Sequence, residues 1–293
     1  MLHAMAMTVP PELARAAPGW FGEDGRRWLE RLPGLLSQIA GLWGLELGPP
    51  YDSRTAFVAR VRTRAGGEAV LKVLVPSDET ASEPDALRWW GGRGAVRLLD
   101  HDPDRCAMLL ESCVPGHDLW SDPDPAALAT RCLTRLWVDP PPRVFEPLGE
   151  RTADWAAKLE DRAARSGYAE PEAAEAAVLL RELPSSEPVR LLLHGDFHPG
   201  NVLASRREPW LAIDPQPVVG DPAFDTGQLI VNLVSRGHDP AAACRTVAGE
   251  AGLDPDRVRA WGFARAAECS LWELGMGDRD GADASLRVAR ALR

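Results

Sequence analysis

The chain has 293 residues, 45% hydrophobic and 26% charged, which is enough for a substantial core in one large domain or two lobes. Its formal net charge is -10 and its basic runs are short, which argues against a nucleic-acid binder. The apolar runs are shorter than the roughly 18 residues of a membrane span, and the N-terminal stretch lacks a basic region. We therefore expect no membrane association, no signal peptide and a cytoplasmic location.

Cysteine and lysine usage narrows the chemistry further. The five cysteines are scattered, odd in number and without a CxxC pair, so neither a disulfide framework nor a zinc cluster is expected. Lys72 and Lys158 are the only lysines among 33 basic residues, so the chain uses arginine for its positive surface charge. A lysine in this sequence is therefore unusual enough to suggest a specific role.

The first half of the chain predicts mostly antiparallel sheet. An apolar pattern from residue 28 to 39 indicates a helix that ends near Gly41. The β-like runs "TAFVARVRT" and "EAVLKVLV" flank the turn "RAGGE" and predict a hairpin. A short helix, "SEPDALRWW", follows, with Ser82 as its N-cap and two glycines as its stop. Two more strands, "AVRLLDHD" and "CAMLLESC", are joined by a turn at 102–104.

The second half is predominantly helical. Pro-rich connections at 114–125 and 139–147 mark the change in composition. The pattern therefore indicates a small β-rich lobe over residues 1–112 and a larger helical lobe over residues 113–293, with a connector near 110–116. A cleft between two lobes is a common place for a ligand. The helices are expected at 153–167, 171–184, 223–235, 239–251 and 254–275, with short β-like segments at 201–203 and 210–213.

The stretch "LLLHGDFHPGN", residues 191–201, ends an apolar run in a cluster of polar side chains. Its glycines and proline break regular structure, so Asp196 and Asn201 project from a tight loop, and a second β-like segment delivers Asp214. Amide and carboxylate oxygens suit Mg²⁺. Asn201 and Asp214 as metal ligands, with Asp196 facing a substrate hydroxyl, give the division of labour that phosphoryl transfer needs.

Two other interpretations of this loop remain open. The alternation of His194, Asp196 and His198 could serve a metal hydrolase, although the remaining histidines lack ligand spacing. The loop could also be a polar turn in which Asp and Asn satisfy backbone groups.

Lys72 lies in the apolar strand "AVLKVLV", where an unpaired ammonium group would lose hydration. Its expected partner is a carboxylate on the next helix, first Glu83 and then Glu79. A strand lysine held by a helix glutamate presents an ammonium group to phosphates. The alternative is an edge lysine whose side chain extends to water. The chain lacks both Walker A and G-x-G-x-x-G sequences, so phosphates would meet the hairpin "PPYDSRTAFVARV", in which Ser53 offers a hydroxyl.

The segments "LLLHGDFHPGNVL" and "WLAIDPQPVVGDPAFD" resemble the aminoglycoside phosphotransferases, closest to the streptomycin 6-phosphotransferase and hydroxyurea phosphotransferase branch. "AVLKV", "ALRWWGGRGAVRLLDHD" and "AMLLESCVPG" agree in order, and the resemblance covers roughly residues 45–275. It implies an α+β, protein-kinase-like bilobal fold with a small antiparallel β-rich N-lobe and a larger, mainly helical C-lobe. It also implies ATP- and Mg²⁺-dependent phosphorylation of a small-molecule hydroxyl.

The resemblance also implies roles for individual residues. Asp196 is expected as the catalytic base, Asn201 and Asp214 as Mg²⁺ ligands, and Lys72 with Glu83 as the phosphate-binding pair. Backbone groups near Glu111 and Cys113 would bind adenine, and His194, Asp221 and Asp225 would support the loop.

The acceptor is expected near the C-terminal helices, where Glu268, Trp272 and Glu273 could face a cationic antibiotic. The glutamates could equally be solvated and the tryptophan part of the core. The leading hypothesis is a kinase of a streptomycin-like aminoglycoside, monomeric or dimeric. The alternatives are a kinase of hydroxyurea, an amino sugar or another metabolite, and a non-catalytic kinase-like binding protein.

Overall fold

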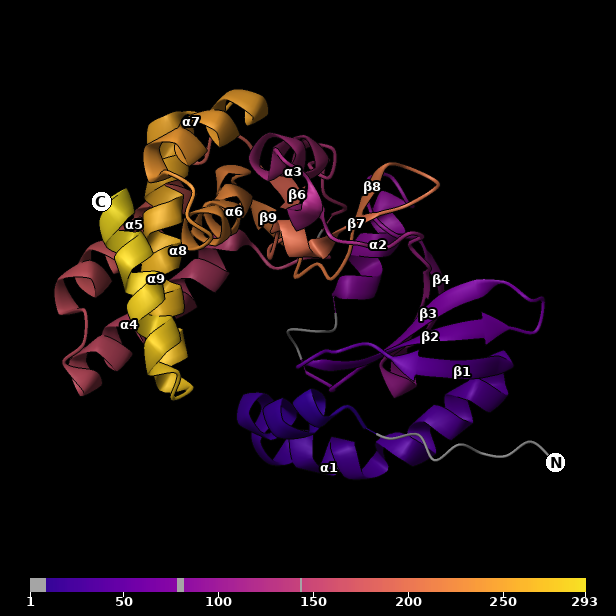
Figure 1. Ribbon diagram of the computed structural model, residues 1–293. Coiled ribbons are helices and arrows are strands. Elements are labelled where there is room, and N and C mark those ends of the chain that lie inside the picture. Colours follow the sequence, from indigo (N-terminus) through magenta and orange to yellow (C-terminus); the bar gives the residue numbers. More distant parts are fainter. Residues whose placement is uncertain (1–8, 78–81, 143) are drawn as a thin grey trace. The chain divides into compact units, whose positions relative to one another are not determined.

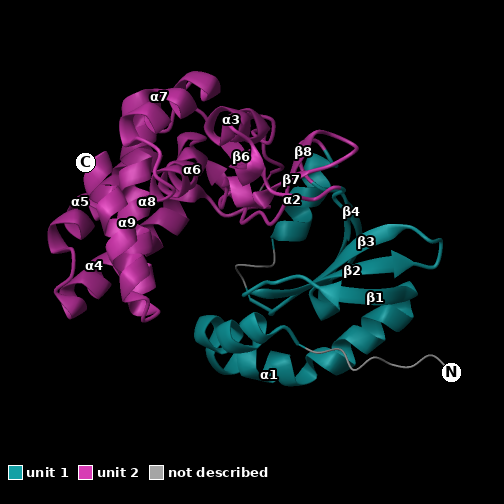
Figure 2. Cartoon of the chain, in the orientation of Figure 1, with its two compact units in different colours: residues 1–92, 96–114 teal, residues 93–95, 115–293 magenta. Residues whose placement is uncertain are grey.

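The computed structural model describes residues 9–77, 82–142 and 144–293. The chain divides into two compact units (Figure 2): unit 1 comprises residues 1–92 and 96–114, and unit 2 comprises residues 93–95 and 115–293. The lobe boundary between 112 and 113 stays a prediction, while residues 93–95 belong to unit 2. The reason is local, since the backbone N–H of Ala212 donates to the carbonyl oxygen of Gly94 at 2.8 Å.

Unit 1 is built on one five-stranded antiparallel sheet with the strand order β1-β2-β3-β5-β4 (Figure 1). The predicted hairpin is confirmed as β2 paired with β3, and the two later strands are confirmed as β4 and β5. β1 was not predicted, because its sequence LELGPP carries a glycine and two prolines that only an edge strand tolerates. The strands are β1 (Leu45–Pro50), β2 (Ala56–Thr63), β3 (Glu68–Leu74), β4 (Leu98–Asp102) and β5 (Ala107–Glu111).

Helix α1 (Pro11–Trp43) covers one face of this sheet (Figure 1). Leu32, Leu36 and Ile39 of α1 form one buried cluster with Phe57 and Leu71 of the strands. The helix begins well before the predicted pattern and bends at Gly22, whose φ is +56°. Because side chains alternate along a strand, the residues between those of the core cluster point to the opposite face.

That opposite face carries Lys72. In the register of the sheet, Lys72 pairs with Val58 on β2 and with Met108 on β5. Helix α2 (Glu83–Trp90) ends at Gly91, which takes the left-handed conformation with φ +58°, as its position after the helix predicts. Ser82 occupies the N-cap position as predicted, although its side chain makes no capping hydrogen bond.

Unit 2 is a helical assembly around two small β-pairs. The helices expected at 223–235, 239–251 and 254–275 are confirmed as α6, α7 and α8, while α9 lies beyond the last one predicted. Each of α7, α8 and α9 begins at an aspartate whose carboxylate accepts a backbone N–H of the first turn. The helices are α3 (Pro125–Thr134), α4 (Leu148–Ser166), α5 (Glu170–Ser185), α6 (Ala223–Ser235), α7 (Pro240–Ala251), α8 (Pro255–Gly275) and α9 (Arg279–Leu292).

The short strands of unit 2 carry the polar loop. β6 (Leu191–Leu193) pairs with β9 (Val218–Gly220), and β7 (Val202–Ala204) pairs with β8 (Trp210–Ala212), both antiparallel. The polar residues of the loop therefore lie between the end of β6 and the start of β7. Among the helices in the described part of the chain, none combines the length and the hydropathy that a bilayer span needs.

Candidate active site

The loop after β6 turns sharply at Gly195, which has a φ of +83°. A Cβ atom at this position would lie 1.9 Å from the carbonyl oxygen of Gln216, so no other residue fits without a backbone shift. The connection between β8 and β9 is fixed to the loop, because the N–H of Gln216 donates to the carbonyl oxygen of His194 at 2.8 Å.

His194 stabilises this loop from inside. Its ring is fully buried. The backbone N–H of Asp196 donates to its Nδ1 at 3.3 Å, and its Nε2 lies 3.0 Å from the carbonyl oxygen of Ile213. Nδ1 therefore acts as an acceptor and Nε2 as a donor, which assigns a neutral ring with its proton on Nε2.

His198 has one nitrogen in a similar role, since its Nδ1 accepts the N–H of Gly200 at 3.1 Å. With both of its nitrogens engaged, His194 is not available as a ligand in the His194–Asp196–His198 arrangement. Over the described ranges no group of three His, Cys, Asp or Glu side chains is placed to hold a metal ion. The geometry thus does not support the hydrolase alternative.

Asp196 is half-buried at the surface of the loop. Burial raises the pKa of its carboxyl group, the nearby His198 and Arg265 lower this pKa, and Asp214 raises it. A carboxylate with a raised pKa that still reaches solvent can accept a proton from a bound hydroxyl.

Asn201 and Asp214 are brought together through the backbone. The N–H of Ile213 donates to the carbonyl oxygen of Asn201 at 2.9 Å, which places Asp214 one residue beyond this contact. Asp214 has a φ of +60°, a conformation that is uncommon outside glycine and is found at functional sites.

The side-chain amide of Asn201 is used on one side only. Its Nδ2 donates to the backbone oxygen of Asp196 at 2.9 Å, which directs the amide, while its Oδ1 accepts no hydrogen bond from any residue in the described part of the chain. An amide oxygen and a carboxylate are hard ligands that suit Mg²⁺, so Asn201 and Asp214 could hold this ion.

Asp225 of α6 holds the loop from behind. Its carboxylate accepts the backbone N–H groups of His194 at 2.9 Å and Gly195 at 2.7 Å, and the indole N–H of Trp137 at 3.0 Å. Burial raises the pKa of Asp225 to about 6, and these three donors oppose the rise. The turn into the site thus depends on a buried carboxylate thirty residues away in the sequence.

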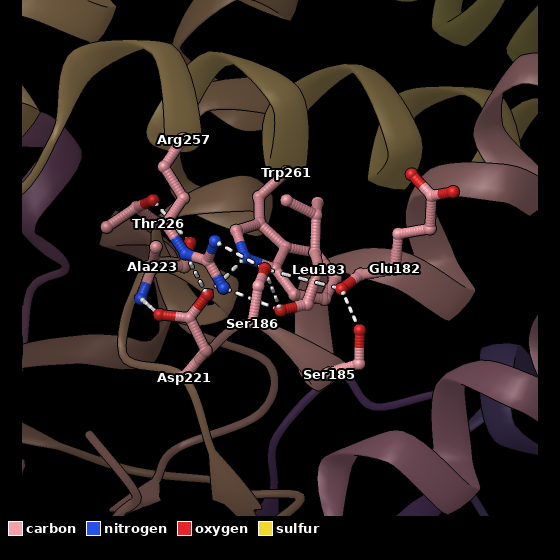
Figure 3. A network of polar contacts seen from close by, with 9 residues as sticks. All are labelled: Glu182, Leu183, Ser185, Ser186, Asp221, Ala223, Thr226, Arg257 and Trp261. Atoms are coloured by element: carbon pink, nitrogen blue, oxygen red, sulfur yellow. Dashed lines mark hydrogen bonds and ion pairs between the residues drawn. The ribbon is translucent and has the colours of Figure 1, made fainter. Parts of the chain in front are cut away.

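Asp221, just before α6, lies in a network of polar contacts that involves α5, α6 and α8 (Figure 3). It is fully buried and accepts hydrogen bonds from Nε of Arg257 at 2.6 Å, the indole N–H of Trp261 at 2.7 Å and the N–H of Ala223 at 3.0 Å. Arg257 also donates to the carbonyl oxygen of Leu183 at the end of α5. These contacts fix the start of α6 against α5 and α8, and α6 in turn carries Asp225.

In unit 1, Lys72 and Glu83 form a buried ion pair. The Nζ atom lies 2.8 Å and 2.7 Å from the two carboxylate oxygens, and the side chains are 7% and 4% exposed. The bidentate contact compensates both charges for their lost hydration. Glu79, the other expected partner, lies outside the described residues.

Three further positions were expected near the nucleotide. The carboxylate of Glu111 accepts the N–H of Arg97 at 3.0 Å, and the N–H of Glu111 donates to the carbonyl oxygen of Arg97, the residue before β4. Ser53 lies in the turn before β2 and is half-buried, and Cys113 is a half-buried free thiol. Nucleotide binding by these three residues stays a prediction.

The residues expected to face the acceptor all lie on α8 and are engaged within unit 2. Glu268 is buried and forms an ion pair with Arg265, and Glu273 accepts the hydroxyl of Ser285 at 2.6 Å. Trp272 is half-buried. Arg265 was not predicted from the sequence, although an arginine three residues before Glu268 on a helix is a recognisable pairing signal.

Comparison with known proteins gives a consistent result. Residues 45–277 match the family model described as "Aminoglycoside/hydroxyurea antibiotic resistance kinase". The chain is 38% identical to a hydroxyurea phosphotransferase of Kitasatospora aureofaciens, over 97% of this chain and 85% of that protein. It is 36% identical to a streptomycin 6-kinase of Streptomyces glaucescens, over 100% of this chain and 99% of that protein.

Solved structures show the same fold at low sequence identity. The aminoglycoside phosphotransferase APH(4)-Ia, in a ternary complex with ADP and hygromycin B, matches with a TM-score of 0.63 and 15% identity, over 88% of this chain and 97% of that chain. The choline kinase LicA from Streptococcus pneumoniae matches with a TM-score of 0.61 and 14% identity, over 90% and 98%. Together with the antiparallel sheet of unit 1 and the helices of unit 2, these matches confirm the predicted protein-kinase-like fold.

Proposed function

This chain belongs to the aminoglycoside and hydroxyurea antibiotic resistance kinases, and from that premise we propose that it phosphorylates a hydroxyl group of a streptomycin-like aminoglycoside. Membership makes it an ATP-dependent phosphotransferase that acts on a small molecule. The observation that carries the assignment of its site is the loop that presents a half-buried Asp196 beside Asn201 and Asp214.

In the proposed reaction, Asp196 accepts the proton of the acceptor hydroxyl. At the same time, the hydroxyl oxygen of the acceptor forms a bond to the γ-phosphorus of ATP. The bond from that phosphorus to the β–γ bridging oxygen breaks, and ADP leaves with the electron pair. The raised pKa of Asp196, caused by burial, makes it a better proton acceptor than an exposed aspartate. The basicity of Asp196 therefore depends on its burial in the loop.

Two groups of residues would hold the nucleotide. Asn201 and Asp214 would bind Mg²⁺, which when present neutralises negative charge on the phosphates. Lys72, oriented by Glu83, would bind the α- and β-phosphates. Backbone groups at Glu111 and Cys113, and the hydroxyl of Ser53, are further proposed contacts to the nucleotide.

A second acceptor is favoured by a separate observation, the 38% identity to a hydroxyurea phosphotransferase. The two substrates are separated by measuring ADP release from ATP and Mg²⁺ with streptomycin and with hydroxyurea, followed by mass spectrometry of the product. We expect ADP release and a phosphorylated product with streptomycin, and none in the Asp196→Ala variant. ADP release with hydroxyurea alone would reassign the acceptor.

The remaining alternative is a kinase-like protein that binds a ligand without turnover. Calorimetric binding of an ATP analogue, combined with no ADP release across aminoglycosides, hydroxyurea and amino sugars, would favour it over the proposed activity.

A further inference from the structure

Arg265 of α8 is held by residues from three helices. Its guanidinium lies over the ring of Trp155 of α4, 4.5 Å from the ring centroid. Its Nε donates to the side-chain oxygen of Gln228 of α6 at 2.9 Å, and its Nη1 pairs with Glu268 one turn along α8. A stacking contact and two hydrogen bonds fix both the plane and the rotation of the guanidinium.

One nitrogen of this fixed group is left over. Nη2 of Arg265 makes no hydrogen bond to a residue within the described ranges, and it is not one of the buried polar atoms that lack a partner. Because Nη2 lacks a partner in the described part of the chain but is not among the fully buried atoms, it contributes to the 16% exposure of the side chain and reaches solvent. An oriented donor at the surface of a site is ready to bind an oxygen atom of a ligand.

This donor is linked through α6 to the loop that carries the proposed base. Asp225 accepts the N–H groups of His194 and Gly195, and Gln228 follows Asp225 by three positions on α6, so both occupy one side of that helix. Arg265 is therefore joined to the Asp196 loop through one turn of α6. Burial raises the pKa of Asp196, and the charge of Arg265 is among those that lower it, as expected for neighbouring groups of opposite charge.

We propose that Nη2 of Arg265 donates a hydrogen bond to an uncharged oxygen of the acceptor, adjacent to the hydroxyl that is phosphorylated. The subsite beside Asp196 then selects an acceptor whose reacting hydroxyl is flanked by a hydroxyl or carbonyl oxygen. A protonated amino or guanidino group in that place would offer only hydrogen-bond donors to Nη2 and would lose this contact. The inference rests on the proposed function and adds the chemistry of the group next to the reacting oxygen.

The pairing of Arg265 with Glu268 also changes the expected role of that glutamate. The charge of Glu268 is balanced inside unit 2, so in this proposal it orients Arg265 and does not itself receive a cation. Cationic groups of an acceptor would then be recognised away from the reacting hydroxyl.

The first test uses the full-length enzyme with Arg265→Gln and Arg265→Lys. We expect the KM for the acceptor, streptomycin or hydroxyurea, to rise about 10- to 100-fold in Arg265→Gln, because a hydrogen bond from a charged donor is lost. The KM for ATP should change little, whereas the thermal unfolding midpoint should fall in Arg265→Gln, because the buried Glu268 loses its cation. Arg265→Lys keeps the charge and can retain the pair with Glu268, but it lacks Nη2, so its acceptor KM should also rise.

Arg259→Gln is the matched control, since Arg259 lies on the same helix, is 46% exposed and donates to the carbonyl oxygens of residues 292 and 293. An acceptor KM in both Arg265 variants equal to that of the control would overturn the proposal. A full recovery of the acceptor KM in Arg265→Lys would also overturn it, since charge alone would then explain the effect.

The second test probes selectivity with hydroxyurea and N-hydroxyguanidine, which differ in that a cationic amidinium replaces the carbonyl group. The wild-type enzyme should prefer hydroxyurea, and Arg265→Gln should narrow the ratio of the two kcat/KM values. An unchanged ratio would contradict the proposal. If the enzyme does not accept hydroxyurea, the KM for streptomycin in the Arg265 variants tests the proposal instead. A wild type inactive on both acceptors would refute the proposed function itself, which is a different result from an active enzyme unaffected at Arg265.

Discussion

The polar loop of unit 2 and the Lys72 strand of unit 1 place their side chains by different means. Lys72 lies on a regular strand whose backbone groups are satisfied by β2 and β5, and its ammonium group is paired with Glu83. The loop from His194 to Asn201 is irregular, and its backbone groups need partners from outside the loop. Asp225 supplies two of these partners.

The difference shows how each region can fail. In unit 1 the sheet determines the position of Lys72, and a substitution that removes one partner of the ion pair leaves the other charge buried. In unit 2 the position depends on contacts spread over α6, α8 and the strand before Asp214, so the loop can be disturbed from a distance. Substitutions that act on one region and spare the other test this comparison.

The largest effect is expected from Asp196→Asn, which removes the base and preserves the shape of the side chain. We expect kcat to fall about 10²- to 10⁴-fold, the range for loss of a general base. Binding of an ATP analogue, measured by calorimetry, should remain close to that of the wild type. Retained turnover would show that another group accepts the proton. Asp154→Asn is the control, because Asp154 is 56% exposed and pairs only with Lys158 at the surface.

Lys72→Met tests the region of unit 1. It leaves the carboxylate of Glu83 buried without its cation, and we expect unfolding free energy to fall by about 3–5 kcal/mol. Adding Glu83→Leu should restore much of this stability in chemical denaturation, but not ATP binding.

Lys158→Met provides a matched control, because the only other lysine forms an exposed pair with Asp154. Its cost should stay under about 1 kcal/mol. Equal losses in the two lysine variants would mean that the pair in unit 1 is not buried as the structure has it.

Trp137→Phe tests the dependence of the loop on distant contacts. It removes the indole donor to Asp225 but leaves the two backbone donors, and we expect a loss of about 2 kcal/mol in thermal or denaturant unfolding. Because that donor lowers the pKa of Asp225, its removal should raise this pKa further. A kcat loss that exceeds the change in ATP affinity would show that the loop has shifted. An unchanged kcat would show that the geometry of the loop does not depend on Trp137.

Local patterns made much of unit 1 predictable. The β2–β3 hairpin follows from alternation on either side of a glycine turn, and α2 follows from an apolar stripe that ends at Gly91. Lys72 and Glu83 are eleven residues apart on consecutive elements, so their contact could be expected from the sequence as well. The role of that pair in binding phosphate stays a prediction.

The supporting contacts of unit 2 could not be predicted in the same way. Trp137 and Asp225 are 88 residues apart, and Arg257 and Asp221 are 36 residues apart. No periodicity relates such positions, since their contact depends on the packing of helices that the sequence places only along the chain. Arg265 was missed for the same reason, because its importance comes from Trp155 and Gln228 on other helices.

The smallest effect expected is a displacement of the pH profile by Arg265→Gln. As a base, Asp196 must be ionised, so kcat/KM should fall as the pH drops through its pKa. Arg265 lowers that pKa against the dominant effect of burial, which raises it, and its removal should move the acid limb to higher pH. Arg265→Lys keeps a cation and should move the limb less, whereas Lys72→Met should leave its position unchanged. An equal displacement of the acid limb in Lys72→Met would mean that Asp196 responds to substitutions in both units. The two regions would then not be independent.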